Sequence, residues 1–338
     1  MSSVFDRDRS AERLPVSLIT GFLGSGKTTL LNRLVQRQEM ADSAVIINEF
    51  GEIALDHLLI APVAGEAVVL ASGCLCCAVR GDLQDTLRDL LVKRDRGEVP
   101  AFARILIETS GLADPAPVAQ LLLNNPLLGH YVRLDAVIAT VAAAGPGSLL
   151  AGHWEARKQI AIADRLLLTK IDIATDAEAA RAVRELRVLN ATAEIMTVVH
   201  GDIPPDRLFG VAAFEHLGGG YAAAEPHAHS HEIAGHCLTA EKPIDWAAFH
   251  DWLGRLRAEH GEKLLRVKGV LNVAGESGPV VIQGVQHVFH PPVALPAWPD
   301  RDRRSRLVMI SRALDRALLE TSWRALGGFS PGGGGLAR

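Results

Sequence analysis

The sequence has no uninterrupted apolar stretch of the length needed to cross a bilayer. A transmembrane helix requires about 20 mostly apolar residues, so we expect neither a membrane-spanning segment nor a membrane partner. The first residues, MSSVFDRDRS, are polar and resemble neither a secretory signal nor a lipidation signal. These features predict a cytoplasmic protein.

A strong excess of either charge is also missing. The 35 Lys and Arg residues nearly balance the 39 Asp and Glu residues, and no basic stripe stands out. Proteins that bind nucleic acid rely on clustered Lys and Arg side chains, so nucleic acid is not an expected partner. The composition, 48% hydrophobic and 22% charged over 338 residues, is that of a globular chain with one large or two medium domains.

Cysteine is scarce, with four in the chain, and three of them crowd together at Cys74, Cys76 and Cys77. In a reducing compartment such a cluster indicates metal binding or redox chemistry rather than a disulfide framework. Thiolates suit Zn²⁺ at about 2.3 Å, and three of them leave a fourth position for a carboxylate, imidazole or water. In an extended segment Cys74 and Cys76 point the same way, and a turn could bring Cys77 round to them.

The alternatives for this cluster are buried structural cysteines and a redox pair. The remaining cysteine, Cys237, stands alone near the start of a predicted strand. We expect it to be a small core residue.

The most informative stretch is residues 16–31, VSLITGFLGSGKTTLL. A short apolar run leads into a glycine-rich segment, and leucines at helical spacing follow at once. Strand, glycine loop and helix in this order are the context of a phosphate-binding P-loop. A glycine-rich turn that merely caps an ordinary helix is the alternative, and the flanking strand and helix favour the P-loop.

The chemistry of such a loop is specific. Glycines let backbone N–H groups fold around phosphate oxygens, and the helix N-terminus adds a partial positive charge. Lys27 is expected to reach the β- and γ-phosphates, and the Thr28 hydroxyl to ligate Mg²⁺. The residues predicted to bind nucleotide in this loop are Gly21, Gly24, Ser25, Gly26, Lys27, Thr28 and Thr29.

A second part of the predicted nucleotide site follows the buried strand over residues 103–107. Glu108 lies where a P-loop protein places the acidic group that holds Mg²⁺ through water and senses the γ-phosphate. Gly111 would let its backbone N–H approach that phosphate. The signal depends on the P-loop upstream, because a Glu after an apolar strand is common.

A third part is the tetrapeptide TKID, residues 169–172, after another buried strand. Guanine carries an N1–H and a 2-amino group, and one carboxylate can accept both protons, whereas adenine offers no such pair. Asp172 is therefore the predicted base selector, with Thr169 beside it and the stem of Lys170 packed on the ring. The pattern favours GTP over ATP.

Strand and helix patterns alternate along the first two thirds of the chain. This alternation predicts an α/β domain over residues 13–217, built on a doubly wound, mostly parallel sheet of the P-loop GTPase class. Residues 1–12 are expected to be a disordered leader. The predicted strands begin near Leu14 and continue over 44–47, 67–70, 103–107, 136–141 and 166–169, and the helices follow the P-loop and cover 82–92, 115–124, 153–163 and 176–188.

Composition changes near residue 218, where a glycine-rich segment begins. We expect residues 218–232 to be a flexible linker. His227, His229 and His231 alternate there, so an extended chain presents all three on one side. A solvated tether and a weak, fast-exchanging metal-collecting segment are both open interpretations.

Beyond the linker, residues 233–326 predict a smaller α+β domain with antiparallel pairing, and residues 327–338 form a glycine-rich tail expected to be disordered. Its predicted strands are 233–238, 264–273, 279–283, 286–289 and 306–310, and its helices are 245–259 and the stretch through Leu314, Leu318 and Leu319.

The motifs GFLGSGKTTLL, NEFGE, GCLCC, ETSGLADP and TKID, in this order, resemble the CobW family of P-loop GTPases, which is related to the nickel-enzyme accessory GTPases HypB and UreG. The resemblance covers about residues 14–326, because RVKG, QGV and a late Trp298…Leu307-Val308…Leu314-Asp315 pattern extend it into the second domain. Ser72 departs from the family pattern, which often has Asn there, and so does Ser311, where Gly is usual.

The resemblance implies a GTP-dependent metallochaperone. Zn²⁺ or Co²⁺ would bind at the three clustered cysteines, with Glu49 and Glu52 near the nucleotide and the metal. The implied partners are a client metalloenzyme or metal-acceptor protein and a second copy of the chain in a nucleotide- or metal-dependent dimer.

The predicted reaction is hydrolysis of GTP to GDP and phosphate, used as a timer on metal binding and delivery. Lys27, Thr28 and Glu108 form the predicted catalytic set. A regulatory GTPase switch with a structural metal remains an alternative. A P-loop phosphotransferase is less favoured, because it would have no use for TKID or the cysteine cluster.

Overall fold

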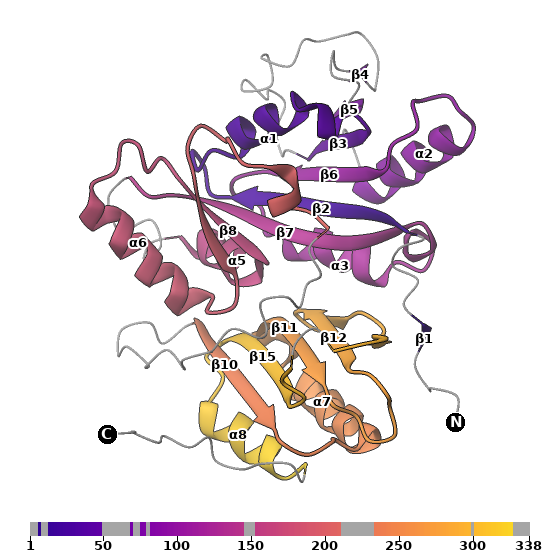
Figure 1. Ribbon diagram of the computed structural model, residues 1–338, viewed down its shortest axis with the longest axis vertical. Coiled ribbons are helices and arrows are strands. Elements are labelled where there is room, and N and C mark those ends of the chain that lie inside the picture. Colours follow the sequence, from indigo (N-terminus) through magenta and orange to yellow (C-terminus); the bar gives the residue numbers. More distant parts are fainter. Residues whose placement is uncertain are drawn as a thin grey trace. The chain divides into compact units, whose positions relative to one another are not determined.

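The computed structural model describes residues 13–48, 82–144, 153–210, 233–298 and 301–326, together with three short strands over 6–7, 68–69 and 75–78. The chain divides into two compact units (Figure 1), one comprising Arg9–Ala213 and the other Met1–Asp8 with Phe214–Arg338. No helix among the described residues is long and apolar enough to span a membrane.

The first unit is built on a sheet whose described strands follow the order β4-β5-β3-β6-β2-β7-β8-β9. Every neighbouring pair is parallel except β4 and β5. This confirms the predicted doubly wound sheet. The strands are β2 (Leu14–Gly21), β3 (Ser43–Asn48), β4 (Val68–Val69), β5 (Leu75–Ala78), β6 (Arg104–Thr109), β7 (Val132–Ala142), β8 (Arg165–Thr169) and β9 (Glu194–Val198).

Helices cover both faces of this sheet (Figure 1), which explains why its central strands are buried without polar alternation. Local signals fix several helix starts: Asp82 caps α2 by accepting from the Gln84 amide, and Thr175 and Glu178 form a capping box on α6. The helices are α1 (Lys27–Val35), α2 (Leu83–Asp95), α3 (Ala116–Asn124), α5 (Trp154–Ile162) and α6 (Asp176–Leu189), with 3₁₀ turns η2 (Gln38–Met40), η4 (Leu128–His130) and η5 (Pro205–Arg207).

The sequence prediction of this unit lacks β5 and β9, and it also lacks β1, which belongs to the second unit. The prediction lacks β9, because that strand lies at the sheet edge, where Thr197 is exposed and no continuous apolar run marks it. Within the leader, Asp6–Arg7 form the short strand β1. It pairs with β14 of the second unit's sheet.

The second unit contains a mostly antiparallel sheet in the order β1-β14-β12-β11-β15-β10, with β13 paired to β12. This confirms the predicted α+β class. Its strands are β10 (Ile233–Ala240), β11 (Leu264–Leu271), β12 (Val280–Val285), β13 (Val288–Phe289), β14 (Val293–Ala294) and β15 (Ser305–Arg312), and its helices are α7 (Trp246–His260), η6 (Gly261–Lys263) and α8 (Arg316–Arg324).

Aromatic side chains from the two helices fill the core of this second unit. The ring of Trp323 in α8 meets those of Phe249 and Trp252 in α7 edge-on, with centroids 6.2 and 5.2 Å away. Edge-to-face contact is a favourable geometry for aromatic pairs. The Trp323 Nε1–H also donates to the Thr239 carbonyl at 2.9 Å, which links α8 to β10.

Two predictions for the second unit need correction. Cys237 is exposed rather than in the core, because β10 is an edge strand in which Leu238 and Ala240 alternate into the core and Cys237 does not. The strand expected over residues 286–289 is shorter, because Gln286 has a φ of +55°. Gln286 therefore belongs to the turn between β12 and β13.

Candidate nucleotide-binding site

The P-loop links the end of β2 at Gly21 to the start of α1 at Lys27. Gly24 and Gly26 have φ angles of +70° and +99°, a region that side-chain-bearing residues rarely adopt. At Gly21 a Cβ atom would lie 2.4 Å from the Thr140 carbonyl oxygen of β7. These glycines are therefore required by the course of the loop.

Lys27 closes the loop on itself. Its side chain is 7% exposed, and its Nζ donates to the carbonyls of Gly21 at 2.9 Å and Phe22 at 3.4 Å. This holds the ammonium group inside the curve of the P-loop, where phosphate oxygens of a nucleotide would meet it.

Neighbouring strands anchor the far side of the P-loop. Ser25 Oγ and Thr140 Oγ1 share a hydrogen bond of 2.6 Å, and the Thr169 hydroxyl donates to the Ser25 carbonyl at 2.6 Å. The first residue of TKID thus helps to shape the P-loop as well as leading to Asp172, the predicted base selector.

Thr28 and Glu108 meet across the carboxyl edge of the sheet. The Thr28 hydroxyl donates to Glu108 Oε1 at 3.2 Å, and Glu108 is only 1% exposed. A hydroxyl and a carboxylate are the hard oxygen donors that Mg²⁺ takes from a protein beside nucleotide phosphates. This donor set therefore fits Mg²⁺, and the structure brings together the residues that the sequence assigned to it.

Gly111 lies against the P-loop, as its predicted role requires. A Cβ atom there would approach the Leu23 backbone nitrogen to 2.9 Å and Leu23 Cδ2 to 2.7 Å. Only a glycine fits at this contact without a shift of one loop. The backbone after β6 therefore packs directly against Leu23 of the P-loop.

The base end of the site contains a loop that the sequence analysis missed. His200 Nε2 lies 3.8 Å from Asp172 Oδ2, and a Cβ at Gly201 would lie 2.8 Å from the Thr29 carbonyl oxygen of α1. The signal available in the sequence was the IMTVVHG run at 195–201. Recognised as a parallel strand, it would have placed residues 199–202 at the same edge as TKID.

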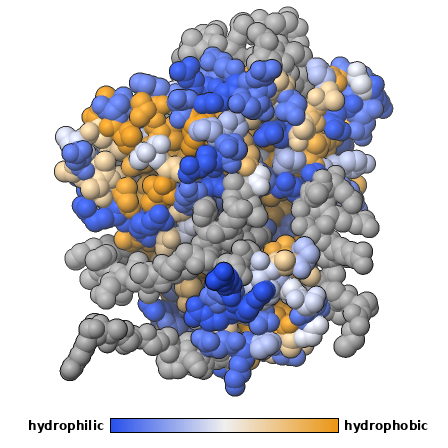
Figure 2. Space-filling view, in the orientation of Figure 1, coloured by the Kyte–Doolittle hydropathy of each residue, from blue (hydrophilic) through white to orange (hydrophobic). Residues whose placement is uncertain are grey.

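Exposed apolar side chains flank this base end. Ile173 is 70% exposed and Val199 is 38% exposed, each next in the chain to one of the two facing residues, Asp172 and His200. In the space-filling view, hydrophobic residues gather over the part of the unit that carries α6 and β8 (Figure 2). Such a surface suits the flat faces of a purine ring.

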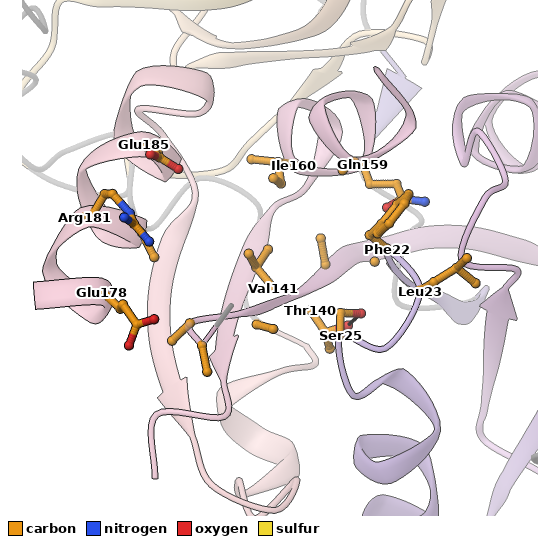
Figure 3. A pocket seen from close by; sticks show the side chains of 17 residues that line it. Phe22, Leu23, Ser25, Thr140, Val141, Gln159, Ile160, Glu178, Arg181 and Glu185 are labelled. Atoms are coloured by element: carbon orange, nitrogen blue, oxygen red, sulfur yellow. Dashed lines mark hydrogen bonds between the residues drawn. The ribbon is translucent and has the colours of Figure 1, made fainter. Parts of the chain in front are cut away.

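A cavity of about 60 Å³ lies against the P-loop, lined by Gly21, Phe22, Leu23 and Ser25 and by residues of β7, α5 and α6 (Figure 3). Phe22 and Gln159 lie at one end, and Glu178, Arg181 and Glu185 at the other. Its volume is a small fraction of the several hundred Å³ typical of a small-molecule site.

The predicted metal ligands lie largely outside the described residues. Cys76 and Cys77 are in β5, where their backbone pairs with Val45 and Ile46 of β3, so the chain is extended through Cys77. The remaining candidates, which are not described, are Cys74, Glu49, Glu52, His227, His229 and His231. Among the side chains that are described, no three His, Cys, Asp or Glu residues gather as a metal site.

The parallel sheet, the P-loop and the facing Thr28 and Glu108 define a protein of the P-loop GTPase class. The family model described as "CobW/HypB/UreG, nucleotide-binding domain" matches residues 15–197, and the model of the "Cobalamin synthesis protein cobW C-terminal domain" matches residues 233–326. The chain belongs to the CobW/HypB/UreG family, and the resemblance seen in the sequence is confirmed.

Curated relatives of similar length include two zinc chaperones. The chain is 35% identical to the zinc chaperone YjiA of Escherichia coli, covering 93% of this chain and 98% of YjiA. It is 32% identical to the zinc chaperone CobW of Pseudomonas aeruginosa, covering 94% and 92%. The crystal structure of Zn(II)-bound YjiA GTPase from E. coli superimposes with a TM-score of 0.75 at 32% identity, covering 93% of this chain and 99% of that one.

Proposed function

We propose that this protein binds GTP with Mg²⁺, hydrolyses it to GDP and phosphate, and uses the reaction to control the binding and delivery of a transition metal. The observation that carries the proposal is the Thr28–Glu108 contact beside Lys27, which joins the start of α1 to the end of β6. Nucleotide chemistry is assigned to residues 13–217, with 233–326 as a separate domain.

In this proposal the chain's own residues orient the triphosphate and select the base. Lys27 leaves its carbonyl partners for the β- and γ-phosphate oxygens, where its charge offsets the charge on the bridging oxygen as the bond to the γ-phosphorus breaks. Thr28 and Glu108 would hold Mg²⁺, which neutralises phosphate charge when bound. Water adds to the γ-phosphorus, GDP leaves, and the water's protons pass to solvent and phosphate.

Base selection is assigned to Asp172, whose carboxylate would accept the N1–H and 2-amino protons of guanine. Lys170 lies between it and Thr169 with a φ of +57°, which sends the chain out of β8 toward the base. The apolar side chains beside Asp172 and His200 support a ring bound at this end.

The proposed cargo site consists of Cys74, Cys76 and Cys77, with Glu49 and Glu52 as nearby carboxylates and His227, His229 and His231 as weak accessory ligands. Three thiolates favour a borderline-soft cation such as Zn²⁺ or Co²⁺ over Mg²⁺. Relatives named zinc chaperones support zinc first. We propose a client metalloenzyme or metal acceptor as recipient, a nucleotide- or metal-dependent dimer and a cytoplasmic location.

The test is to load the protein with Zn²⁺ and follow phosphate release and zinc transfer to a fluorescent chelator in the same sample. Lys27→Ala should lower the hydrolysis rate by about 100-fold or more, and Lys93→Ala, a lysine of α2 outside the site, should not. Zinc transfer should accelerate with GTP but not with a non-hydrolysable analogue. Zinc transfer at the same rate with GTP and with the non-hydrolysable analogue would instead favour a regulatory switch with a structural metal.

A further inference from the structure

Helix α5 carries a buried amide that grips the loop after β6. The Gln159 side chain is 1% exposed, and its Nε2 donates to the Gly111 carbonyl at 3.1 Å and the Ala113 carbonyl at 3.0 Å. The amide thus uses both of its protons on one short segment. That segment begins three residues after Glu108.

A second α5 side chain holds the other end of the same segment. Lys158 Nζ pairs with Asp114 Oδ2 at 2.7 Å, and Asp114 Oδ1 accepts from the Ala116 amide at 3.0 Å where α3 begins. Two consecutive residues of α5 therefore fix residues 111–114 at both ends.

Gly111 is held between two contacts, one from α5 and one from the P-loop. Gln159 holds its carbonyl, and on its other side Leu23 of the P-loop leaves no room for a Cβ atom. Fixing a peptide carbonyl restricts ψ of that residue, so the direction of the Gly111 backbone depends on the Gln159 amide. A displacement of either partner would move Gly111 away from the phosphate end of the site.

The orientation of the Gln159 amide follows from its partners. Its Oε1 is buried, accepts no hydrogen bond within the described part of the chain, and belongs to a residue lining the cavity beside Phe22 (Figure 3). The reverse orientation would set this oxygen against two carbonyl oxygens and is excluded by repulsion. What the site uses is therefore the pair of N–H donors, which neither a carboxylate nor an apolar side chain can supply.

We propose that Gln159 is a positioning residue for GTP hydrolysis: it holds Gly111 where its N–H meets the γ-phosphate, and so sets how strongly the protein distinguishes GTP from GDP. This inference rests on the proposed GTPase function. Gln159 does not touch the nucleotide in this proposal. It acts through Gly111 alone.

The experiment compares GDP affinity, affinity for a non-hydrolysable GTP analogue, and hydrolysis rate in the full-length protein. Gln159→Met keeps the length of the side chain but removes both donors. It should weaken analogue binding and slow hydrolysis by about tenfold each, because the two buried hydrogen bonds to the loop are lost. GDP affinity should stay within about twofold, because Lys27 and Asp172 are untouched. Glu155→Gln, an isosteric change in the first turn of α5, is the control.

A second variant separates positioning from a merely structural role. In Gln159→Glu the buried carboxyl faces two carbonyl oxygens, which raises its pKa, as burial does for glutamates that reach about 8–9. Protonated, it donates one hydrogen bond; ionised, it repels the loop. Hydrolysis by Gln159→Glu, relative to the parent at each pH, should therefore fall as pH rises from 6 to 9, while Glu155→Gln follows the parent.

The outcomes are distinct. Equal GTP-to-GDP discrimination in Gln159→Met and parent, or equal loss of both nucleotides, would overturn the positioning role while the proposed function stands. If Gln159→Met does not fold, the pH profile of Gln159→Glu decides, and a flat relative profile would overturn it. A parent protein that binds no GTP would overturn the proposed function itself.

Discussion

At the scale of single residues, the site depends on a few close contacts between loops far apart in the sequence. Thr28 meets Glu108, Gly111 lies against Leu23, and the Thr169 hydroxyl holds the Ser25 carbonyl. The sequence was sufficient to name these residues apart from Leu23, because strand ends of a parallel sheet share one edge and their residue types match phosphate and Mg²⁺ chemistry.

Other residues of the site could not be identified from the sequence. Gln159 sits in α5, where no sequence pattern indicates a function, and its proposed role comes from tertiary contacts with carbonyls more than forty residues away. His200 follows an edge strand that the apolar pattern did not reveal. Every residue has a backbone carbonyl, so a side chain that hydrogen-bonds to carbonyls cannot be matched to its partners from residue types.

Asp172→Asn is the sharpest residue-level prediction. The substitution replaces an acceptor oxygen by a donor that faces the N–H groups of guanine. An unpaired polar group in a closed site costs about 1–3 kcal/mol, so GTP affinity should fall by about ten- to a hundredfold. Nucleotide titration of parent and variant measures this, with the exposed Asp176→Asn as control. Equal GTP affinity in parent and Asp172→Asn would remove Asp172 from the base site.

At the scale of elements, the two units are held together internally by different means. The first relies on apolar runs buried between two helix layers, and this alternation is why its fold could be predicted. The second buries an aromatic cluster beneath an antiparallel sheet. Successive side chains of a strand point to opposite faces of such a sheet, so a prediction that assigns a residue to the wrong face places it in solvent instead of the core, or the reverse. Cys237 shows the result: its strand was predicted, but not that the residue faces away from the core.

Trp323→Ala tests the aromatic cluster of the second unit. Trp323 is 2% exposed and bridges α8, α7 and β10. Truncating a buried tryptophan costs about 3–5 kcal/mol, so the free energy of unfolding of this unit should drop by that amount in chemical denaturation. Leu318→Ala, on the same helix but 44% exposed, should change it by less than about 1 kcal/mol. A loss no larger than that of Leu318→Ala would show that the cluster does not stabilise the unit.

At the scale of the whole molecule, the central claim is that nucleotide state and metal affinity are coupled. The loops after β3 and β6 leave parallel strands that pair side by side, so they emerge at one edge of the sheet, and Cys76 and Cys77 lie in β5, which pairs with β3. The γ-phosphate and its Mg²⁺ order such loops, and hydrolysis releases them. A metal at the cysteine cluster should therefore be held more tightly with GTP than with GDP.

The most direct test is a competition titration of Zn²⁺, repeated with Co²⁺, in the presence of GDP and then of a non-hydrolysable GTP analogue. The analogue should tighten metal binding by about 5–150-fold, and by linkage the metal should tighten analogue binding by the same factor. The Cys74→Ala/Cys76→Ala/Cys77→Ala protein should lose the coupling and still bind GDP. Metal affinity that is the same with both nucleotides would contradict the metallochaperone mechanism.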